Sequence, residues 1–242
     1  MTPEEYRRAE RLLARRDPVL RALIRAHGPC GMSRSQRTDP FVAMVEAIVW
    51  QQLSTRAAAT IYARVLATLP DGGRPTPEAL ASADPVALRA AGLSRAKVAY
   101  IQDLAAKVRD GVVRLERLAV LDDQAVIDEL TKVKGIGRWT AEMFLMFRLH
   151  RPDVLPLGDV GLINAIRRAY RLRRTPTLTR LTRLSEAWRP YRSVACWYLW
   201  QSLEAVPVTP NFSRPPSSKA LSSPVVSPHA GSRRVGRSRP RH

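Results

Sequence analysis

The chain has 242 residues, of which 45% are hydrophobic, a length that allows one sizeable core or two small lobes that share an interface. Its 40 Lys and Arg against 21 Asp and Glu give a net charge of +19, which favours a polyanionic partner. Nucleic acid is the first expectation, although an anionic membrane surface would suit the same charge. No apolar run reaches 18 residues and the N-terminus is charged, which excludes an ordinary membrane span or secretory signal.

The chain has only two cysteines, Cys30 and Cys196. Two thiols are too few for a four-cysteine iron–sulfur cluster or zinc site, and their separation in sequence does not suggest a redox pair. We interpret them as buried thiols of a cytoplasmic protein.

Residues 1–206 predict an all-α protein, because apolar residues recur at intervals of three and four and alternating β-branched runs are nearly absent. Prolines and acidic residues near the start of a helix, and glycines after its end, set the expected bounds. In chain order, helices are expected over 3–16, 18–27, 41–50 and 55–69, then two short helices before Gly92, and a longer helix over 95–109.

After Gly111, a helix is expected from Asp122 or Asp123 to Lys132, followed by the tight turn 133–137 and a helix over 138–149. A loop over 150–158 then leads to helices expected over 160–170, 177–187 and 190–204. The fold class predicted is a two-lobed helical bundle.

Residues 207–242 have a different composition, with seven prolines, seven Lys or Arg and no acidic residue. This composition predicts a disordered basic tail, which adds nonspecific phosphate attraction or is a plain solvated extension. The remaining residues keep a charge of +12, so the basic character also belongs to the folded part.

The turn Val133-Lys134-Gly135-Ile136-Gly137 joins two expected helices. Its two glycines permit a sharp turn and a close approach to another surface, and free N–H groups at the start of a helix form an anion site that suits a DNA phosphate. A simple glycine-containing turn between two packed helices is the alternative interpretation.

The stretches LTKVKGIGRWTAEMFLMF (130–147) and HRPDVLPLGDVGL (150–162) resemble the helix-hairpin-helix DNA glycosylase superfamily, named for its hairpin, Gly/Pro-rich loop and aspartate. Pro152 and Pro156 supply the rigid loop. Three more stretches, AIVWQQLSTRAAATIYARV (47–65), AAGLSRAKVAYIQDLA (90–105) and WRPYRSVACWYLW (188–200), resemble the 3-methyladenine DNA glycosylase II branch. The resemblance implies the compact form of that branch, without its N-terminal sheet domain.

Asp159 is the candidate catalytic carboxylate, because it falls where this family places its aspartate. Taken alone, the Gly158-Asp159 pair before a helix predicts either a structural N-cap or a carboxylate at the positive end of the helix. Asp153 is a weaker candidate that we expect to cap a helix or pair with an arginine.

Trp139 occupies the position at which bifunctional members of the superfamily carry the lysine that forms a Schiff base. The resemblance therefore implies hydrolysis without strand cleavage. Trp139 is expected to border the base pocket, where its ring can stack on a cationic alkylated purine, or else to be a core residue. Trp50 is the candidate for a second wall of this pocket.

The junction Gln51-Gln52-Leu53-Ser54 lies where family members present the residue that fills the gap left by the flipped base. Gln52 or Leu53 is the expected wedge, with a buried core position as the alternative for Leu53. The tryptophans and tyrosine near the C-terminus recur at helical intervals and are expected in the core: Trp188, Tyr191, Trp197 and Trp200.

The hairpin residues expected to contact DNA are Lys134, Gly135, Ile136, Gly137 and Thr140. Family hairpins can also hold a monovalent cation through backbone carbonyls, which here would be those of Thr131, Val133 and Ile136. No other cofactor is implied.

Together these features predict a monomeric, nucleoid-associated glycosylase domain over 1–206, with DNA and the damaged base in a cleft between two helical lobes. It would hydrolyse the N-glycosidic bond of alkylated purines, 3-methyladenine and 7-methylguanine, in double-stranded DNA. The alternatives are another damaged or mismatched base as substrate, or a damage-binding module that does not cut.

Overall fold

The computed structural model describes residues 1–34, 39–70 and 73–203. Every regular element within these residues is helical, which confirms the all-α prediction. The basic tail predicted over 207–242 lies outside the described residues. No helix among those described is long and apolar enough to span a bilayer.

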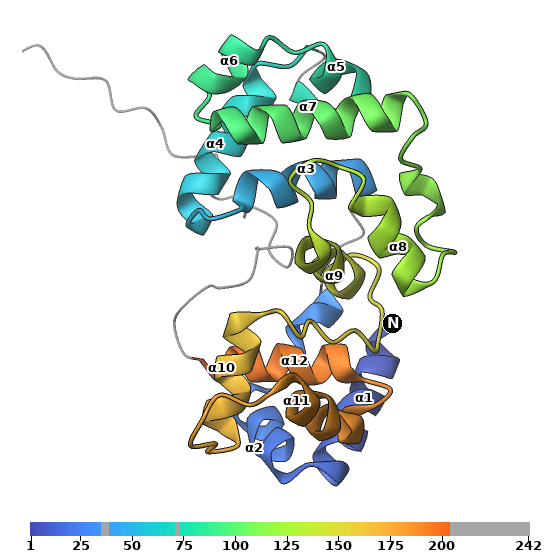
Figure 1. Ribbon diagram of the computed structural model, residues 1–242, viewed down its shortest axis with the longest axis vertical. Coiled ribbons are helices and arrows are strands. Elements are labelled where there is room, and N and C mark those ends of the chain that lie inside the picture. The colour runs from blue at the N-terminus through green and yellow to red at the C-terminus, as the bar shows by residue number, and fades with distance from the viewer. Residues whose placement is uncertain (35–38, 71–72, 204–242) are drawn as a thin grey trace, which may run out of the picture.

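The helices form two lobes, one above the other in Figure 1. The terminal lobe contains helices from both ends of the described chain, and the hairpin lobe contains those between. The terminal lobe consists of α1 (Pro3–Arg16), α2 (Pro18–His27), α10 (Val160–Ala169), α11 (Leu178–Ser185) and α12 (Arg192–Gln201). The hairpin lobe consists of α3 (Pro40–Trp50), α4 (Thr55–Ala67), α5 (Pro77–Ala81), α6 (Pro85–Ala90), α7 (Arg95–Arg109), α8 (Asp123–Leu130) and α9 (Arg138–Phe147).

Most helix starts agree with the sequence prediction because side-chain caps determine them. Thr2 and Glu5 form a capping box at α1. Asp17, Asp39 and Asp84 accept hydrogen bonds from the first amides of α2, α3 and α6, and each is followed by a proline, which fits the first turn of a helix.

Helix ends differ from the prediction by a few residues. The helix expected over 138–149 ends at Phe147, because the chain turns through His150, which has a left-handed φ of 51°. The helix expected from 190 begins at Arg192, whose N–H and guanidinium both bond to Asp153. Two 3₁₀ turns, Gly31–Arg34 and Leu115–Arg117, were not predicted because neither has an apolar period long enough to recognise.

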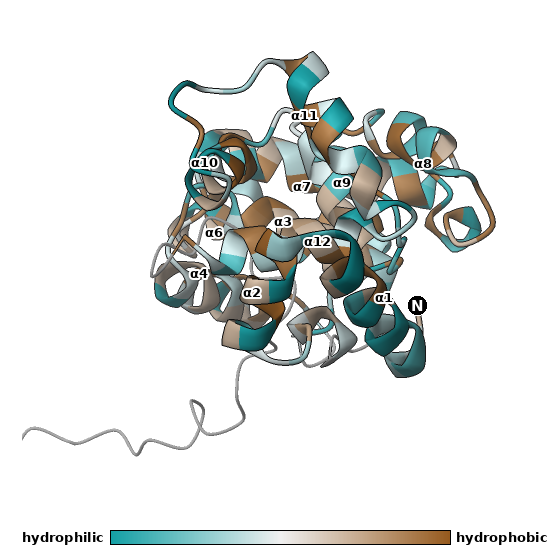
Figure 2. Ribbon diagram, turned by 90° about the horizontal axis from the view of Figure 1, so that it is seen from below, coloured by the Kyte–Doolittle hydropathy of each residue, from teal (hydrophilic) through white to brown (hydrophobic). Residues whose placement is uncertain are grey.

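A single hydrophobic core runs through both lobes. In Figure 2 the apolar residues of α3 and α12 lie near the centre, whereas the outer face of α1 is hydrophilic. Trp188 and Trp200 are buried, as predicted, whereas Tyr191 and Trp197 are partly buried against the core. Cys30 and Cys196 are buried free thiols, which confirms the prediction for both.

Candidate active site and nucleic-acid interface

A cavity of about 820 Å³ lies between the α3–α4 turn, the start of α7, the hairpin and the start of α10. Seven of the residues predicted from the sequence line it: Trp50, Gln52, Leu53, Gly135, Trp139, Thr140 and Asp159. Residues up to 109 positions apart in the sequence therefore meet at one site.

Asp159 is the N-cap of α10 and is only 5% exposed. Its Oδ1 accepts hydrogen bonds from the Leu162 amide and, at 3.1 Å, from the Trp200 indole N–H. Its Oδ2 accepts a hydrogen bond from the Trp139 indole N–H at 2.6 Å. Three N–H donors suit a carboxylate that only accepts, and they fix its orientation at the cavity wall. The N-cap and the cavity carboxylate, which the sequence offered as alternatives, are thus the same residue.

The two tryptophans that hold Asp159 differ in their relation to the cavity. Trp139 is partly buried and lines the cavity, so its ring borders the space while its N–H orients the carboxylate. Trp200 is buried among core residues, as predicted, yet it also donates to Asp159. Sequence periodicity indicated the burial of Trp200 but gave no sign of this hydrogen bond, because its acceptor lies 41 residues away.

Trp50 lines the opposite side of the cavity and is partly buried. Its ring contacts Tyr62 edge-on, with centroids 5.4 Å apart. Its indole N–H is buried and has no hydrogen-bond partner within the described part of the chain. Trp50 thus lines the cavity, and its role as a second wall of the base pocket stays a prediction.

The wedge turn, residues 51–53, projects from the end of α3. Gln52 is exposed and has a left-handed φ of 57°, and Leu53 is 38% exposed, so a core position for Leu53 is excluded. Lys97 Nζ donates to the carbonyl oxygens of Val49 and Gln51, each at 2.7 Å, and satisfies groups that the end of α3 leaves open. The backbone of the turn is therefore anchored while both candidate wedge side chains remain exposed.

The hairpin, residues 133–137, turns sharply at Gly135, whose φ is 78°. A Cβ at this position would lie 2.2 Å from the Tyr100 ring of α7, so both backbone conformation and space require glycine. Gln51 Nε2 donates to the Gly135 carbonyl at 3.1 Å and joins the wedge turn to the hairpin. Tyr100 and Lys97 were not among the predicted site residues, because nothing in their spacing indicates a partner so far along the chain.

Only part of the hairpin backbone is open to a ligand. The Lys134 amide donates to Asp103 Oδ2 at 2.8 Å and the Ile136 amide to the Val133 carbonyl at 3.1 Å. Gly135 and Gly137 are exposed, and their amides have no acceptor within residues 1–34, 39–70 and 73–203. The predicted contact residues thus separate into exposed Lys134, Gly135 and Gly137 and the buried Ile136 and Thr140, the latter 6% exposed at the cavity wall.

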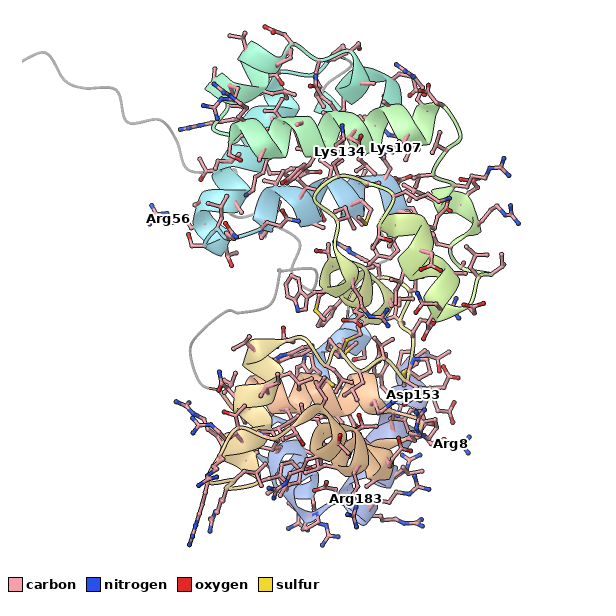
Figure 3. All side chains as sticks on the ribbon, viewed as in Figure 1. Arg8, Arg56, Lys107, Lys134, Asp153 and Arg183 are labelled. Carbon is pink, nitrogen blue, oxygen red and sulfur yellow. The ribbon has the colours of Figure 1, made fainter. Side chains whose placement is uncertain are left out.

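The ammonium of Lys107 lies beside the hairpin (Figure 3), where it contacts Asp103 Oδ2 at 2.8 Å and the Lys132 carbonyl at 2.6 Å. Burial alone would raise the pKa of Asp103, but the hydrogen bonds from Lys107 and from the Lys134 amide lower it overall. The Lys107 ammonium thus already binds a backbone carbonyl of this segment. The carbonyls predicted to hold a monovalent cation, those of Thr131, Val133 and Ile136, belong to the same segment.

Asp153 forms ion pairs with Arg189, at 2.6 Å, and Arg192, at 2.7 Å, and does not line the cavity. This confirms its prediction as a partner of arginine. These pairs fasten the loop before α10 to the start of α12.

Comparison with known proteins agrees with this geometry. Residues 45–190 match the HhH-GPD superfamily base excision DNA repair protein family, and the chain belongs to this superfamily. It is 34% identical over 197 residues to DNA-3-methyladenine glycosylase 1 of Schizosaccharomyces pombe, covering 81% of this chain and 86% of that protein. It is 33% identical over 174 residues to DNA-3-methyladenine glycosylase 2 of Escherichia coli, covering 67% of this chain and 57% of that protein.

Within the superfamily the chain is therefore similar to the 3-methyladenine DNA glycosylases. Its structure is similar to that of the S. pombe 3-methyladenine DNA glycosylase Mag1 in complex with abasic DNA, with a TM-score of 0.71 and 33% identity, over 84% of this chain and 99% of that chain. A Clostridium acetobutylicum 8-oxoguanine glycosylase/lyase, 19% identical with a TM-score of 0.65, shares the fold alone.

Proposed function

We propose that this protein is a monofunctional DNA glycosylase that flips an alkylated purine out of duplex DNA and hydrolyses its N-glycosidic bond. The observation that carries the proposal is the oriented carboxylate of Asp159 at the wall of the cavity between the two lobes. A base inside the stack cannot reach such a cavity, so the nucleotide must leave the helix, at a cost of a few kcal/mol.

In the proposed reaction the bond between the sugar C1′ and the base nitrogen breaks, and its electron pair leaves with the base. The positive charge that develops on the sugar is stabilised by Asp159, and water then adds to C1′ and releases its extra proton to the solvent. The products are the free base and an intact abasic site. Among the described residues that line the cavity, Asp159 is the only carboxylate.

One carboxylate suits a base that needs no general acid. A purine alkylated on a ring nitrogen carries a positive charge and leaves as a neutral molecule, so it departs without protonation. Trp139, at the cavity wall beside Asp159, offers a ring face to such a cation. These features favour 3-methyladenine and 7-methylguanine over neutral damaged bases.

The proposed mechanism has no Schiff-base step, because position 139 is tryptophan rather than lysine. Lys97 also lines the cavity, but its ammonium bonds to two carbonyl oxygens of α3 and the wedge turn. We assign Lys97 to holding that turn rather than to chemistry.

In the proposed complex, Gly135, Gly137 and the first turn of α9 bind a phosphate, and Gln52 occupies the gap left by the flipped base. We favour Gln52 over Leu53 because it is the middle residue of the wedge turn, is exposed and has a left-handed φ of 57°. The enzyme acts as a cytoplasmic, nucleoid-associated monomer on double-stranded DNA. It requires no cofactor, and the carbonyls of Thr131, Val133 and Ile136 are the candidate ligands for a structural monovalent cation.

The test is release of free bases from DNA treated with a methylating agent, compared with duplexes that contain 8-oxoguanine, uracil or a mismatch. We expect 3-methyladenine and 7-methylguanine to be released and the other bases to remain. Release of only the other bases would change the substrate class, and tight binding to damaged duplex with no release would favour the module that does not cut. Borohydride should trap no covalent adduct, and robust trapping would refute the monofunctional assignment.

A further inference from the structure

Positive charge is unevenly divided between the two lobes. In the terminal lobe, residues 1–30 and 159–203 contain 16 arginines against 6 acidic residues. In the hairpin lobe, residues 39–70 and 73–158 contain 15 Lys or Arg against 13 acidic residues. The hairpin and the wedge turn therefore belong to the nearly neutral lobe, and of the two lobes the one without them carries most of the net positive charge.

Five of these arginines lie within eight residues at the end of α10: Arg167, Arg168, Arg171, Arg173 and Arg174. All except the partly buried Arg167 are exposed. None of the five has a carboxylate within ion-pair distance in the described part of the chain. We call these five residues the arginine segment.

Stabilisation of α10 explains only part of this segment. Arg167 and Arg168 are in the last turn of the helix, where a cation interacts favourably with the helix dipole. Arg171, Arg173 and Arg174 follow the helix and the dipole effect does not extend to them. These three exposed guanidinium groups make no side-chain hydrogen bond or ion pair with residues 1–34, 39–70 or 73–203.

The helix α10 connects this segment to the cavity. It begins beside Asp159 at the gap between the lobes and runs down to the far end of the terminal lobe in Figure 1. At 1.5 Å per residue, Arg168 lies about 14 Å along the axis from Asp159. That length corresponds to roughly four base pairs of B-DNA, at 3.4 Å per pair.

We infer that the arginine segment binds backbone phosphates of the duplex about four base pairs to one side of the flipped nucleotide, as a second anchor besides the hairpin. This inference rests on the proposed function, because it takes the cavity as the position of the lesion. Guanidinium groups bind phosphate oxygens through paired N–H donors, and a duplex that lies across the cavity along the direction of α10 would bring a row of phosphates to the end of this helix. The contact carries no sequence information.

The test variant replaces Arg168, Arg173 and Arg174 together with glutamine in the full chain. Its affinity for a duplex with a central tetrahydrofuran abasic analogue is measured over a range of salt concentrations. Each lost phosphate contact reduces the slope of log affinity against log salt by about 0.9, so the expected reduction is about 2.7.

The matched control replaces Arg7, Arg8 and Arg11 with glutamine, which changes the charge by the same amount within the same lobe. These exposed residues belong to α1, on the side of the terminal lobe opposite α10 in both ribbon views, and Figure 3 labels Arg8 there. The control should keep the slope of the wild type. Equal reductions in both variants would overturn the inference and leave only a general electrostatic effect. No reduction in either variant would overturn the inference as well, because these arginines would then make no phosphate contact.

Shortening the duplex gives a second readout. With fewer than four base pairs on one side of the lesion, wild type and the arginine-segment variant should have the same salt slope. Shortening the duplex on the other side should leave their slopes different. A difference that persists with both short flanks would overturn the inference. Binding is measured without base release, so the two proposals can fail separately. If the salt slope falls only in the arginine-segment variant but the wild type releases no base, the proposed function is refuted and the phosphate contact remains supported.

Discussion

The two sides of the cavity hold their functional groups in opposite ways. On the α9–α10 side, Asp159 is buried and each of its oxygens accepts from an indole N–H. On the α3–α4 side, Gln52 and Leu53 are exposed and only the backbone beneath them is fixed, through Lys97 and Gln51. The chemistry proposed for the first side needs a charge in a fixed position, whereas insertion into DNA needs an exposed side chain on an anchored backbone.

The hairpin joins these two sides, so its disruption should have the largest effect. Gly135→Ala places a Cβ against Tyr100 and forces a left-handed φ on alanine, which should destabilise the fold by about 2–4 kcal/mol. Thermal unfolding measures this loss, and the affinity for undamaged duplex should fall equally for all sequences.

Gly137→Ala is the matched control for this change. Its φ is −94° and no atom lies within 4 Å of the added Cβ, so alanine fits there without strain. Equal destabilisation by both substitutions would contradict the requirement for glycine at position 135.

A hydrogen bond to Asp159 can be removed without changing a residue that lines the cavity. Trp200→Phe removes an N–H donor to Asp159, and Trp200 does not line the cavity. We expect excision to slow about 10- to 100-fold, the value of a hydrogen bond to a charged acceptor, with DNA affinity unchanged. Single-turnover kinetics measure the excision rate, and Trp197→Phe on the same helix is the control. Equal rates in the two variants would show that the Trp200 hydrogen bond has no part in excision.

The wedge side should respond in binding and flipping rather than in the bond-breaking step. Lys97→Met removes the ammonium that anchors two carbonyls at the end of α3. We expect flipping, followed by the fluorescence of 2-aminopurine beside the lesion, to weaken about tenfold. Lys97→Arg, which keeps the charge and the N–H donors, should restore part of the flipping. An unaltered fluorescence signal in Lys97→Met would mean that flipping does not depend on this anchor.

The smallest expected effect concerns the support of the hairpin by Asp103. Because the folded protein lowers the pKa of Asp103, this carboxylate stabilises the fold above its ordinary pKa of about 3.9, and the contribution disappears as pH falls through the lower folded value. The stability difference between wild type and Asp103→Asn, about 1 kcal/mol at neutral pH, should therefore shrink in acid. A difference that stays constant down to pH 2 would argue against this linkage.

Local chemistry made most of the fold predictable from the sequence. Proline at the first turn of a helix, preceded by Asp, Thr or Ser as cap, marks a helix start without any tertiary information. The end of α9 and the start of α12 differ from the prediction because they depend on the turn at His150 and on Asp153, contacts that no local pattern contains.

The residues of the candidate site that lie within one motif were predictable from the sequence. Those contributed by distant segments were not. Asp159, Trp139 and the hairpin lie within 30 residues and share one recognisable pattern. Trp200, Lys97 and Tyr100 support that pattern from 41, 46 and 35 residues away, measured to Asp159, Gln51 and Gly135, so only packing shows their part.

Asp159 is proposed to perform the chemistry in addition to capping α10. Single-turnover release of 7-methylguanine by wild type and by Asp159→Asn tests this role, since asparagine also caps a helix. We predict that release falls by about 100- to 1,000-fold while affinity for the abasic-analogue duplex is retained. Release at nearly the wild-type rate by Asp159→Asn would show that this carboxylate does not perform the chemistry.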